Sequence, residues 1–165
     1  MSADDGAAPL DEWPGDHNHE HCIADALDRA EELCAGKGVR LTELRRRVLE
    51  LIWDSHKPVG AYAILDTLKD DQRSAAPPTV YRALDFLIEH RLVHRIQSLN
   101  AFVGCADPDH PHAGFFLICN ECGDAVEIED ENVDRVVTAT AKDRGFDIST
   151  QIVEATGRCP QCRTA

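Results

Sequence analysis

The sequence predicts an α+β fold in two parts, a helix-rich N-terminal part and a smaller C-terminal part that mixes strands with one helix. Apolar residues recur at helical spacing in four segments before residue 91, and short alternating segments follow at 92–97 and 101–105. Two Cys-x-x-Cys pairs lie in the last third of the chain, Cys119 with Cys122 and Cys159 with Cys162. Because 165 residues divided in two leave each part a small apolar core, we expect a metal or a partner subunit to add stability.

The chain is acidic, with a formal net charge of −13, but the charge is spread unevenly. Residues 40–95 hold ten Lys and Arg against eight Asp and Glu, whereas residues 1–39 hold two against ten and residues 96–165 hold five against twelve. An acidic chain has little general attraction for phosphate, so any contact with DNA has to be local and specific.

Residues 1–18 are acidic and rich in Gly, Pro and Ala, and we interpret them as a disordered tail. They lack the basic start and apolar run of a secretory signal, and no apolar stretch of the chain is long enough to span a bilayer. We therefore expect a cytoplasmic protein with no membrane partner, in a reducing compartment where paired cysteines bind metal rather than form disulfides.

The first predicted helix starts within a cluster of potential metal ligands, His17, His19, His21 and Cys22, and ends near Gly36. The cluster is either a solvated helix start or an accessory metal site. On the same helix Cys34 falls on the apolar side, where we expect a small core residue. A second helix follows Thr42, which is a suitable N-cap. Its start is surrounded by Arg40, Arg45, Arg46 and Arg47. These arginines suit either backbone phosphates or a solvated helix face.

Pro58 and Gly60 interrupt the chain before a third helix that has Tyr62 in its first turn. Pro77 and Pro78 then precede a fourth helix, which we expect at about residues 79–90 with Thr79 as its cap. The residues that this helix is expected to bury are Val80, Ala83, Leu84, Leu87 and Ile88.

Helices followed by a two-stranded hairpin predict a winged helix-turn-helix over residues 19–98, with the fourth helix reading the major groove of DNA. Arg82 could bind a guanine, and Tyr81 and Tyr62 could contact the sugar-phosphate backbone or a thymine methyl group. The same topology also occurs in plain interaction modules.

Residues 99–165 are predicted to form a small α/β domain for dimerisation and metal binding. We expect strands at 114–119, 125–129 and 146–154 and a helix at 133–144, with an edge strand available for pairing with a second chain. Its two Cys-x-x-Cys pairs are separated by 36 residues. Four thiolates on two tight turns suit a tetrahedral structural Zn²⁺ with no open position for catalysis.

A second potential ligand set consists of His94, Cys105, His112 and Glu127. Taken singly, each has an ordinary structural explanation, since a histidine in a wing is usually solvated and a cysteine in a strand is usually a core residue. Together they would join the wing, the following loop and the C-terminal domain through a mixed nitrogen, sulfur and oxygen site.

Four segments, PPTVYRALDFLIEHRLVHRI, NAFVGC, FFLICNECG and CPQC, resemble the ferric uptake regulator (Fur) superfamily, and most closely its zinc uptake regulator (Zur) branch. The resemblance covers about residues 22–162. It implies a homodimeric winged-helix repressor with a metal as co-repressor. It assigns structural zinc to Cys119, Cys122, Cys159 and Cys162. It assigns a regulatory zinc to His94, Cys105, His112 and Glu127. It also implies DNA contacts at Tyr62, Arg82 and Tyr81, beside which Thr79 and Arg45 are further candidates.

The expected function is a zinc-responsive transcriptional repressor of zinc uptake genes, with one structural and one regulatory Zn²⁺ per chain and an A/T-rich palindromic operator. The alternative is a Fur-type regulator that responds to iron, manganese or peroxide. Such relatives usually carry a His-rich run before the first Cys pair, where this chain has HAGFFLIC, and the Cys105 thiolate favours zinc. His110 is a possible additional ligand. We expect no enzyme, because a zinc deaminase needs a His-x-Glu motif that this chain lacks.

Overall fold

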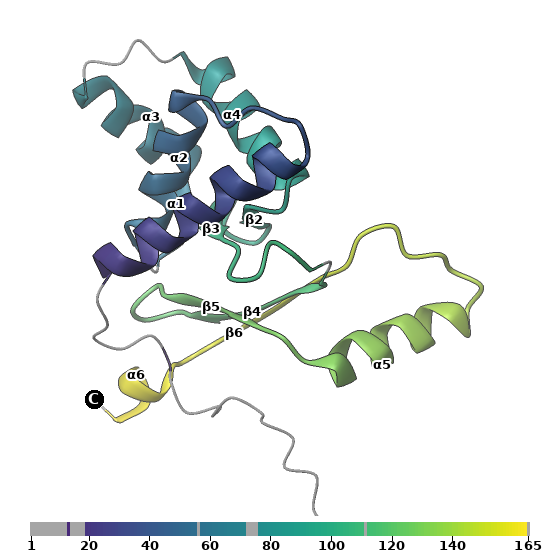
Figure 1. Cartoon of the computed structure of the whole chain (residues 1–165). Helices are drawn as coiled ribbons and strands as arrows, with labels where there is room; N and C mark the ends of the chain where they lie inside the picture. The colour runs from purple at the N-terminus through teal and green to yellow at the C-terminus, as the bar shows by residue number, and fades with distance from the viewer. Residues whose placement is uncertain (1–12, 14–18, 56, 72–75, 111, 165) are drawn as a thin grey trace, which may run out of the picture.

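The structure is a computed structural model that describes residue 13 and residues 19–55, 57–71, 76–110 and 112–164. The predicted disordered tail therefore lies outside the described residues, apart from Trp13, and so do His17 and the side chains of His19 and His21. Four helices form the N-terminal part: α1 (His19–Gly36), α2 (Glu43–Trp53), α3 (Ala61–Asp70) and α4 (Pro77–Glu89). Figure 1 shows them gathered on one side of the molecule.

The second helix starts as predicted. The Thr42 side chain accepts a hydrogen bond from the backbone N–H of Arg45, and the apolar stripe of α2 is buried at Val48, Leu49 and Ile52. Cys34 is 2% exposed inside the helical core, as expected of a small core residue. Stripes from α1, α3 and α4 complete this core, which makes the N-terminal part the better packed of the two.

Two details of α4 were predicted wrongly. The helix begins at Pro77 with Ala76 as its N-cap, so Thr79 lies inside the first turn and caps nothing. A proline at the first helical positions costs no hydrogen bond, because the first N–H groups of a helix have no acceptor within it. Ile88 was expected to be buried but is 36% exposed, and Phe86, which was not expected, is buried instead.

A three-stranded antiparallel sheet in the order β1-β3-β2 forms the wing. Its strands are β1 (Val59–Gly60), β2 (Val93–Ile96) and β3 (Ala101–Gly104). The predicted hairpin is thus present, and the two-residue strand β1 is an addition that the sequence pattern did not indicate. The turn between β2 and β3 ends at Asn100, whose φ of 47° is a left-handed conformation that Asn tolerates.

The C-terminal part contains a second sheet in the order β5-β4-β6, formed by β4 (Gly114–Cys119), β5 (Ala125–Ile128) and β6 (Ile152–Gly157). Helix α5 (Glu131–Lys142) connects β5 to β6, and α6 (Pro160–Thr164) ends the fold. The strand predicted at 146–154 in fact begins at Ile152. The Phe146 N–H instead bonds back to Ala141 O, after Gly145 with a φ of 67°, and so closes the C-terminal end of α5.

The two parts meet where the wing lies against the second sheet, while α5 extends away from both (Figure 1). Ile96 of β2 packs with Phe116 and Ile118 of β4, and all three are at most 4% exposed. The α+β class, with a wing followed by a small α/β part, is confirmed. No helix in the described part of the chain is long and apolar enough to cross a membrane.

Candidate metal centres

Of the side chains that the structure describes, two groups of four could hold a metal ion. They are the two groups expected from the sequence. In each group, one ligand atom per residue lies within 4.8 Å of all the others.

The four cysteines meet at one end of the second sheet. Cys119 ends β4 and Cys122 follows it across a turn that needs Gly123, whose φ is 81°. Cys159 directly precedes α6 and Cys162 lies within it, and the Sγ atoms of Cys122 and Cys159 are 3.9 Å apart. Sulfur atoms bound tetrahedrally to Zn²⁺ at about 2.3 Å lie roughly 3.8 Å from one another, so the arrangement fits a closed four-thiolate site.

Backbone N–H groups stabilise negative charge at this group. Hydrogen bonds from the backbones of Cys122 and Cys159 lower the pKa of the Cys119 thiol to about 6. A hydrogen bond with the Cys159 side chain raises the pKa of Cys162 to about 12. Four neighbouring thiols therefore do not all ionise unless a cation balances their charge, which is what a structural metal would do.

The second group draws each ligand from a different segment. His94 lies on β2, Cys105 follows β3, His112 precedes β4, and Glu127 lies on β5. The Nε2 atoms of both histidines are 2.8 Å from Glu127 Oε1 and 3.2 Å from each other. Cys105 Sγ is 3.6 Å from His112 Nε2. Tetrahedral nitrogen and oxygen ligands of Zn²⁺ lie about 3.3 Å apart, so the four atoms fit one metal ion.

Local contacts aim these ligands inward. His112 Nδ1 lies 2.9 Å from the backbone oxygen of His110, which suits an Nδ1–H donor and leaves Nε2 free to bind a metal. The Ala106 N–H donates to Glu127 Oε2 at 3.4 Å, so that Oε1 faces the histidines. Gly104 allows the chain to pass Trp53, because a Cβ at Gly104 would lie 2.2 Å from the indole ring.

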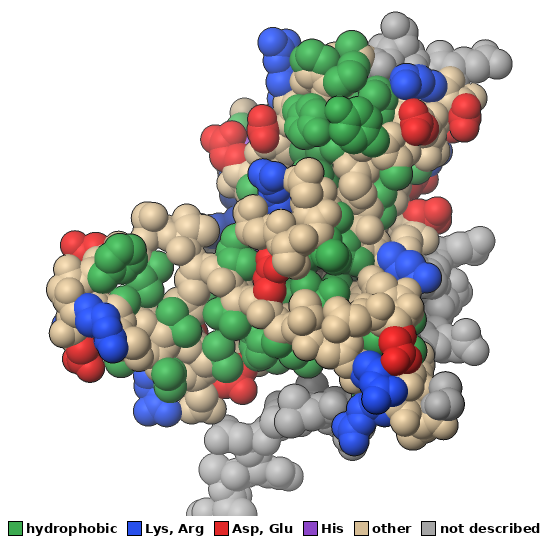
Figure 2. All heavy atoms as spheres, turned by 180° about the vertical axis from the view of Figure 1, so that it is seen from behind, with side chains coloured by type: hydrophobic (Ala, Val, Ile, Leu, Met, Phe, Trp, Pro, Cys, Tyr) green, Lys and Arg blue, Asp and Glu red, His purple; other side chains and the backbone are tan. Residues whose placement is uncertain are grey.

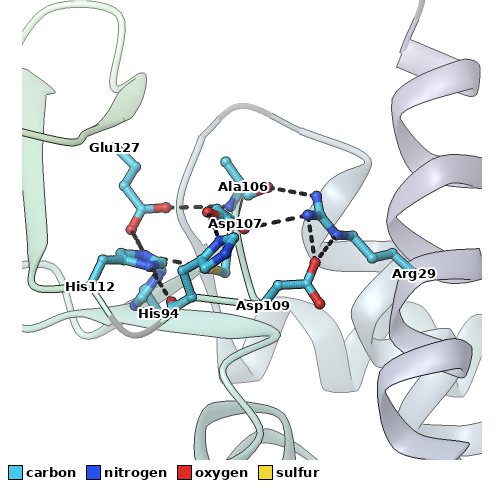
Figure 3. Close-up of polar contacts among 9 residues, drawn as sticks. Arg29, His94, Ala106, Asp107, Asp109, His112 and Glu127 are labelled. Carbon is cyan, nitrogen blue, oxygen red and sulfur yellow. Dashed lines mark hydrogen bonds and ion pairs between the residues drawn. The ribbon is translucent and has the colours of Figure 1, made fainter. Parts of the chain in front are cut away.

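An arginine from α1 holds the loop that carries two of the ligands (Figure 3). Arg29 bonds Asp109 Oδ2 at 2.6 Å and, at 3.4 Å each, Asp107 Oδ1 and the Ala106 backbone oxygen. The loop between Cys105 and His112 is thereby tied to the first helix. No sequence signal indicated this contact, since Arg29 and the loop are about 80 residues apart.

Burial shapes the ionisation of the second group. Burial and the nearby Glu127 carboxylate raise the pKa of the Cys105 thiol to about 12. Burial also opposes ionisation of Glu127, but its hydrogen bond and charge interaction with His94 prevail and lower the pKa of that carboxyl. A divalent cation would therefore displace a proton from Cys105 on binding.

Two candidate accessory ligands lie outside both groups. His110 points its Nδ1 at Asp107 Oδ2, 2.8 Å away, and its side chain is 77% exposed. Cys22 is half-buried on α1. The structure does not bring either residue into the four-ligand groups.

Most of the candidate DNA contacts lie on the surface of the winged-helix part. Tyr62 is 71% exposed and Tyr81 42%, and Arg82 and Thr79 are exposed on α4. Arg45 differs, because its guanidinium lies 3.6 Å from the centre of the Phe86 ring and donates to the Arg40 backbone oxygen. Its neighbours Arg46 and Arg47 form ion pairs with Glu31 and with Glu50 and Asp71.

The fold and its two ligand groups define a winged-helix protein with a candidate metal centre at the junction of its two parts. The family model described as the ferric uptake regulator family matches residues 36–156. The zinc uptake regulation protein of Escherichia coli is 40% identical over 137 residues, which are 82% of this chain and 80% of that protein. The chain belongs to the ferric uptake regulator family.

Solved structures agree with this assignment. A zinc uptake regulator complexed with zinc and DNA superposes with a TM-score of 0.82 at 38% identity, over 86% of this chain and 95% of that chain. The protein XcZur gives a TM-score of 0.80 in its holo form, at 44% identity over 86% of this chain and 99% of that one. The apo form of XcZur gives a TM-score of only 0.51, at 43% identity over 86% of this chain and 97% of that one.

Proposed function

We propose that this chain is a zinc-responsive, DNA-binding transcriptional repressor of zinc uptake genes, in which Zn²⁺ is the co-repressor that orders a homodimer for operator binding. The observation that carries the proposal is the group of His94, Cys105, His112 and Glu127. Its four side chains come from the wing, the following loop and the second sheet and meet at one point. Metal bound there would fix the angle between the two parts.

The comparison with XcZur supports a role for metal in the arrangement of the two parts. Sequence identity and coverage are nearly the same for its holo and apo forms, yet the TM-score falls from 0.80 to 0.51. A difference of this size at constant sequence is one of conformation. This chain has the arrangement of the holo form, which we take to be the DNA-binding one and call the closed arrangement.

We assign one structural Zn²⁺ to Cys119, Cys122, Cys159 and Cys162 of each chain. The regulatory Zn²⁺ would lie in the second group, where it supplies a Lewis-acid centre that holds four ligands together. Moving a dimer from about 1:99 to 99:1 closed needs roughly 10⁴-fold preference, so two equivalent sites need only about 100-fold each. By linkage, operator DNA tightens zinc binding by the same factor. Thiolate ligands of this kind require a reducing compartment, which we propose is the cytoplasm.

The proposed dimer explains an apolar surface in the C-terminal part. None of the residues of α5 is buried, and Val136, Phe146 and Ile152 are 59%, 65% and 40% exposed. Figure 2 shows apolar side chains on this arm of the molecule. Strand β6 is an edge strand of the second sheet. Pairing of β6 with its copy, and covering of α5, would bury this surface in a homodimer.

We propose that α4 reads the major groove of an A/T-rich palindromic operator through Arg82 and Tyr81, with Tyr62 and Thr79 at the backbone. Arg45 is the weaker candidate, because its guanidinium already packs on Phe86. Arg82→Ala should weaken operator affinity roughly 10- to 100-fold for each half-site and leave the zinc ions bound, since each protomer of the dimer loses one base contact. Fluorescence anisotropy with operator DNA measures this. Arg158→Ala, which loses only an exposed pairing with Glu121, is the charge-matched control. Equal losses in both variants would refute the specific role of Arg82.

The metal that activates binding separates this proposal from its alternative. Operator affinity should rise with Zn²⁺ at buffered concentrations and not with Fe²⁺ or Mn²⁺, because a Cys105 thiolate and two imidazoles suit zinc. Peroxide should not release the DNA at doses that spare the four-cysteine site. Activation by Fe²⁺ or Mn²⁺ alone would favour the iron, manganese or peroxide regulator instead.

A further inference from the structure

Three residues form one row across the second sheet and face the wing. In the strand register, Phe116 of β4 lies opposite Glu127 of β5 and also opposite Glu154 of β6. Residues opposite one another in register point to the same face of a sheet. The row therefore presents a carboxylate, an aromatic ring and a second carboxylate in that order.

The wing lies along this row. His94 of β2 contacts Glu127 at 2.8 Å, and its ring lies 5.5 Å from the Phe116 ring. Ile96 packs in the same apolar cluster as Phe116. At the far end, Glu154 accepts hydrogen bonds from the backbone N–H groups of Gln97 at 2.6 Å and Ser98 at 3.1 Å.

The Glu154 carboxylate makes two hydrogen bonds to a segment of the chain 57 residues away. Each carboxylate oxygen takes one N–H group at the start of the turn between β2 and β3. Charge-assisted hydrogen bonds of this kind are stronger than neutral ones. Burial opposes ionisation of Glu154, but the hydrogen bonds from Ser98 and Gln97 prevail and lower the pKa of the carboxyl.

The contacts at the two ends of the row differ in whether they involve the metal. The Glu127 end belongs to the regulatory metal group, whereas the Glu154 end uses protein atoms only. We propose that Glu154 is a positioning residue, a metal-independent clamp that holds the wing in the same closed arrangement that regulatory zinc stabilises. This deepens the proposed function and rests on it.

The clamp and the regulatory metal both stabilise the closed arrangement relative to the open one. When either is lost, the other has to supply more of the free energy of closure. A ligand can shift a conformational equilibrium only by its differential affinity for the two states. If the clamp favours the closed state, zinc has to supply less of the free energy of closure. Removing the clamp therefore raises the zinc concentration needed for closure. The loss of a charge-assisted pair of hydrogen bonds should shift that concentration about 10-fold.

Glu154→Gln tests the proposal in the full-length dimer, because it keeps the shape of the side chain and removes its charge. Closure is followed without DNA, by small-angle X-ray scattering against buffered free Zn²⁺, and zinc per chain is counted. We expect half-maximal closure at about 10-fold higher free zinc than in the wild type, with the dimer and the four-cysteine zinc retained. Asp147→Asn, the same charge change on the exposed loop after α5, should follow the wild-type curve.

Two results would overturn the clamp. One is a Glu154→Gln closure curve that coincides with the wild-type curve. The other is loss of the dimer or of the four-cysteine zinc in Glu154→Gln, which would make the residue structural only. Operator binding measured on the same samples separates the clamp from the proposed function. A shifted closure curve together with DNA binding that ignores zinc would support the clamp and reject the repressor.

Discussion

Cys105→Ser should abolish zinc-activated operator binding and leave a folded dimer that still holds one zinc per chain. Cys105 supplies the sulfur of the regulatory group, and a serine hydroxyl is a poor zinc ligand at neutral pH. If each regulatory zinc supplies about 100-fold preference for the closed arrangement, the variant should lose most of a roughly 10⁴-fold activation. Anisotropy with operator DNA at buffered zinc, with zinc counted by mass spectrometry of the native dimer, measures both effects.

Cys34→Ala is the matched control for the loss of a thiol. Cys34 is buried in the helical core and lies outside both ligand groups, so its loss should alter stability slightly and zinc activation not at all. Full zinc activation in Cys105→Ser would remove Cys105 from the regulatory site. Loss of both zinc ions would show that the two groups are not independent.

Cys119→Ser should cost the dimer itself. The apolar cluster of the second sheet is small, with Ile96, Phe116 and Ile118 as its buried residues, and Ile96 belongs to the wing. Apparent zinc binding energies of about 10–16 kcal/mol in small structural sites exceed what such a cluster supplies. Without its fourth sulfur the site should lose zinc, and the C-terminal part should melt while the four N-terminal helices remain.

Sedimentation velocity and circular dichroism together measure this second variant. We expect a monomer with reduced strand content, a retained helical signal and no zinc that survives chelation. Arg158→Gln is a suitable control at the same end of the sheet, since it loses only an exposed pairing with Glu121. A stable, zinc-free Cys119→Ser dimer would contradict the structural role.

The order of the elements could be predicted because local signals determine it. The Thr42 cap, the apolar stripes of the helices and the two cysteine pairs all lie within a few residues of what they specify. The exact start of α4 could not, because Pro77 and Pro78 are compatible with either a stop or a first turn. The start of β6 is set by its parallel pairing with β4, from Gly114 with Ile152 to Cys119 with Gly157.

The ligand groups and the residues that support them also differ in how far the sequence indicates them. The cysteine pairs have a spacing that predicts a site. The spacing of His94, Cys105, His112 and Glu127 leaves ordinary structural explanations open, and the family resemblance is what assigns them one zinc ion. Arg29 and Glu154 gave no sequence signal. Their partners lie 80 and 57 residues away, and only the folded sheet and helix place them side by side.

The most direct test of zinc-responsive repression is operator binding across a wide range of buffered free Zn²⁺, with bound zinc counted per chain at each point. We expect one zinc per chain to survive chelation and a second, weaker one to switch DNA binding on as it binds. DNA binding that is already complete with a single zinc per chain, or that follows Fe²⁺ or Mn²⁺ instead, would contradict this expectation.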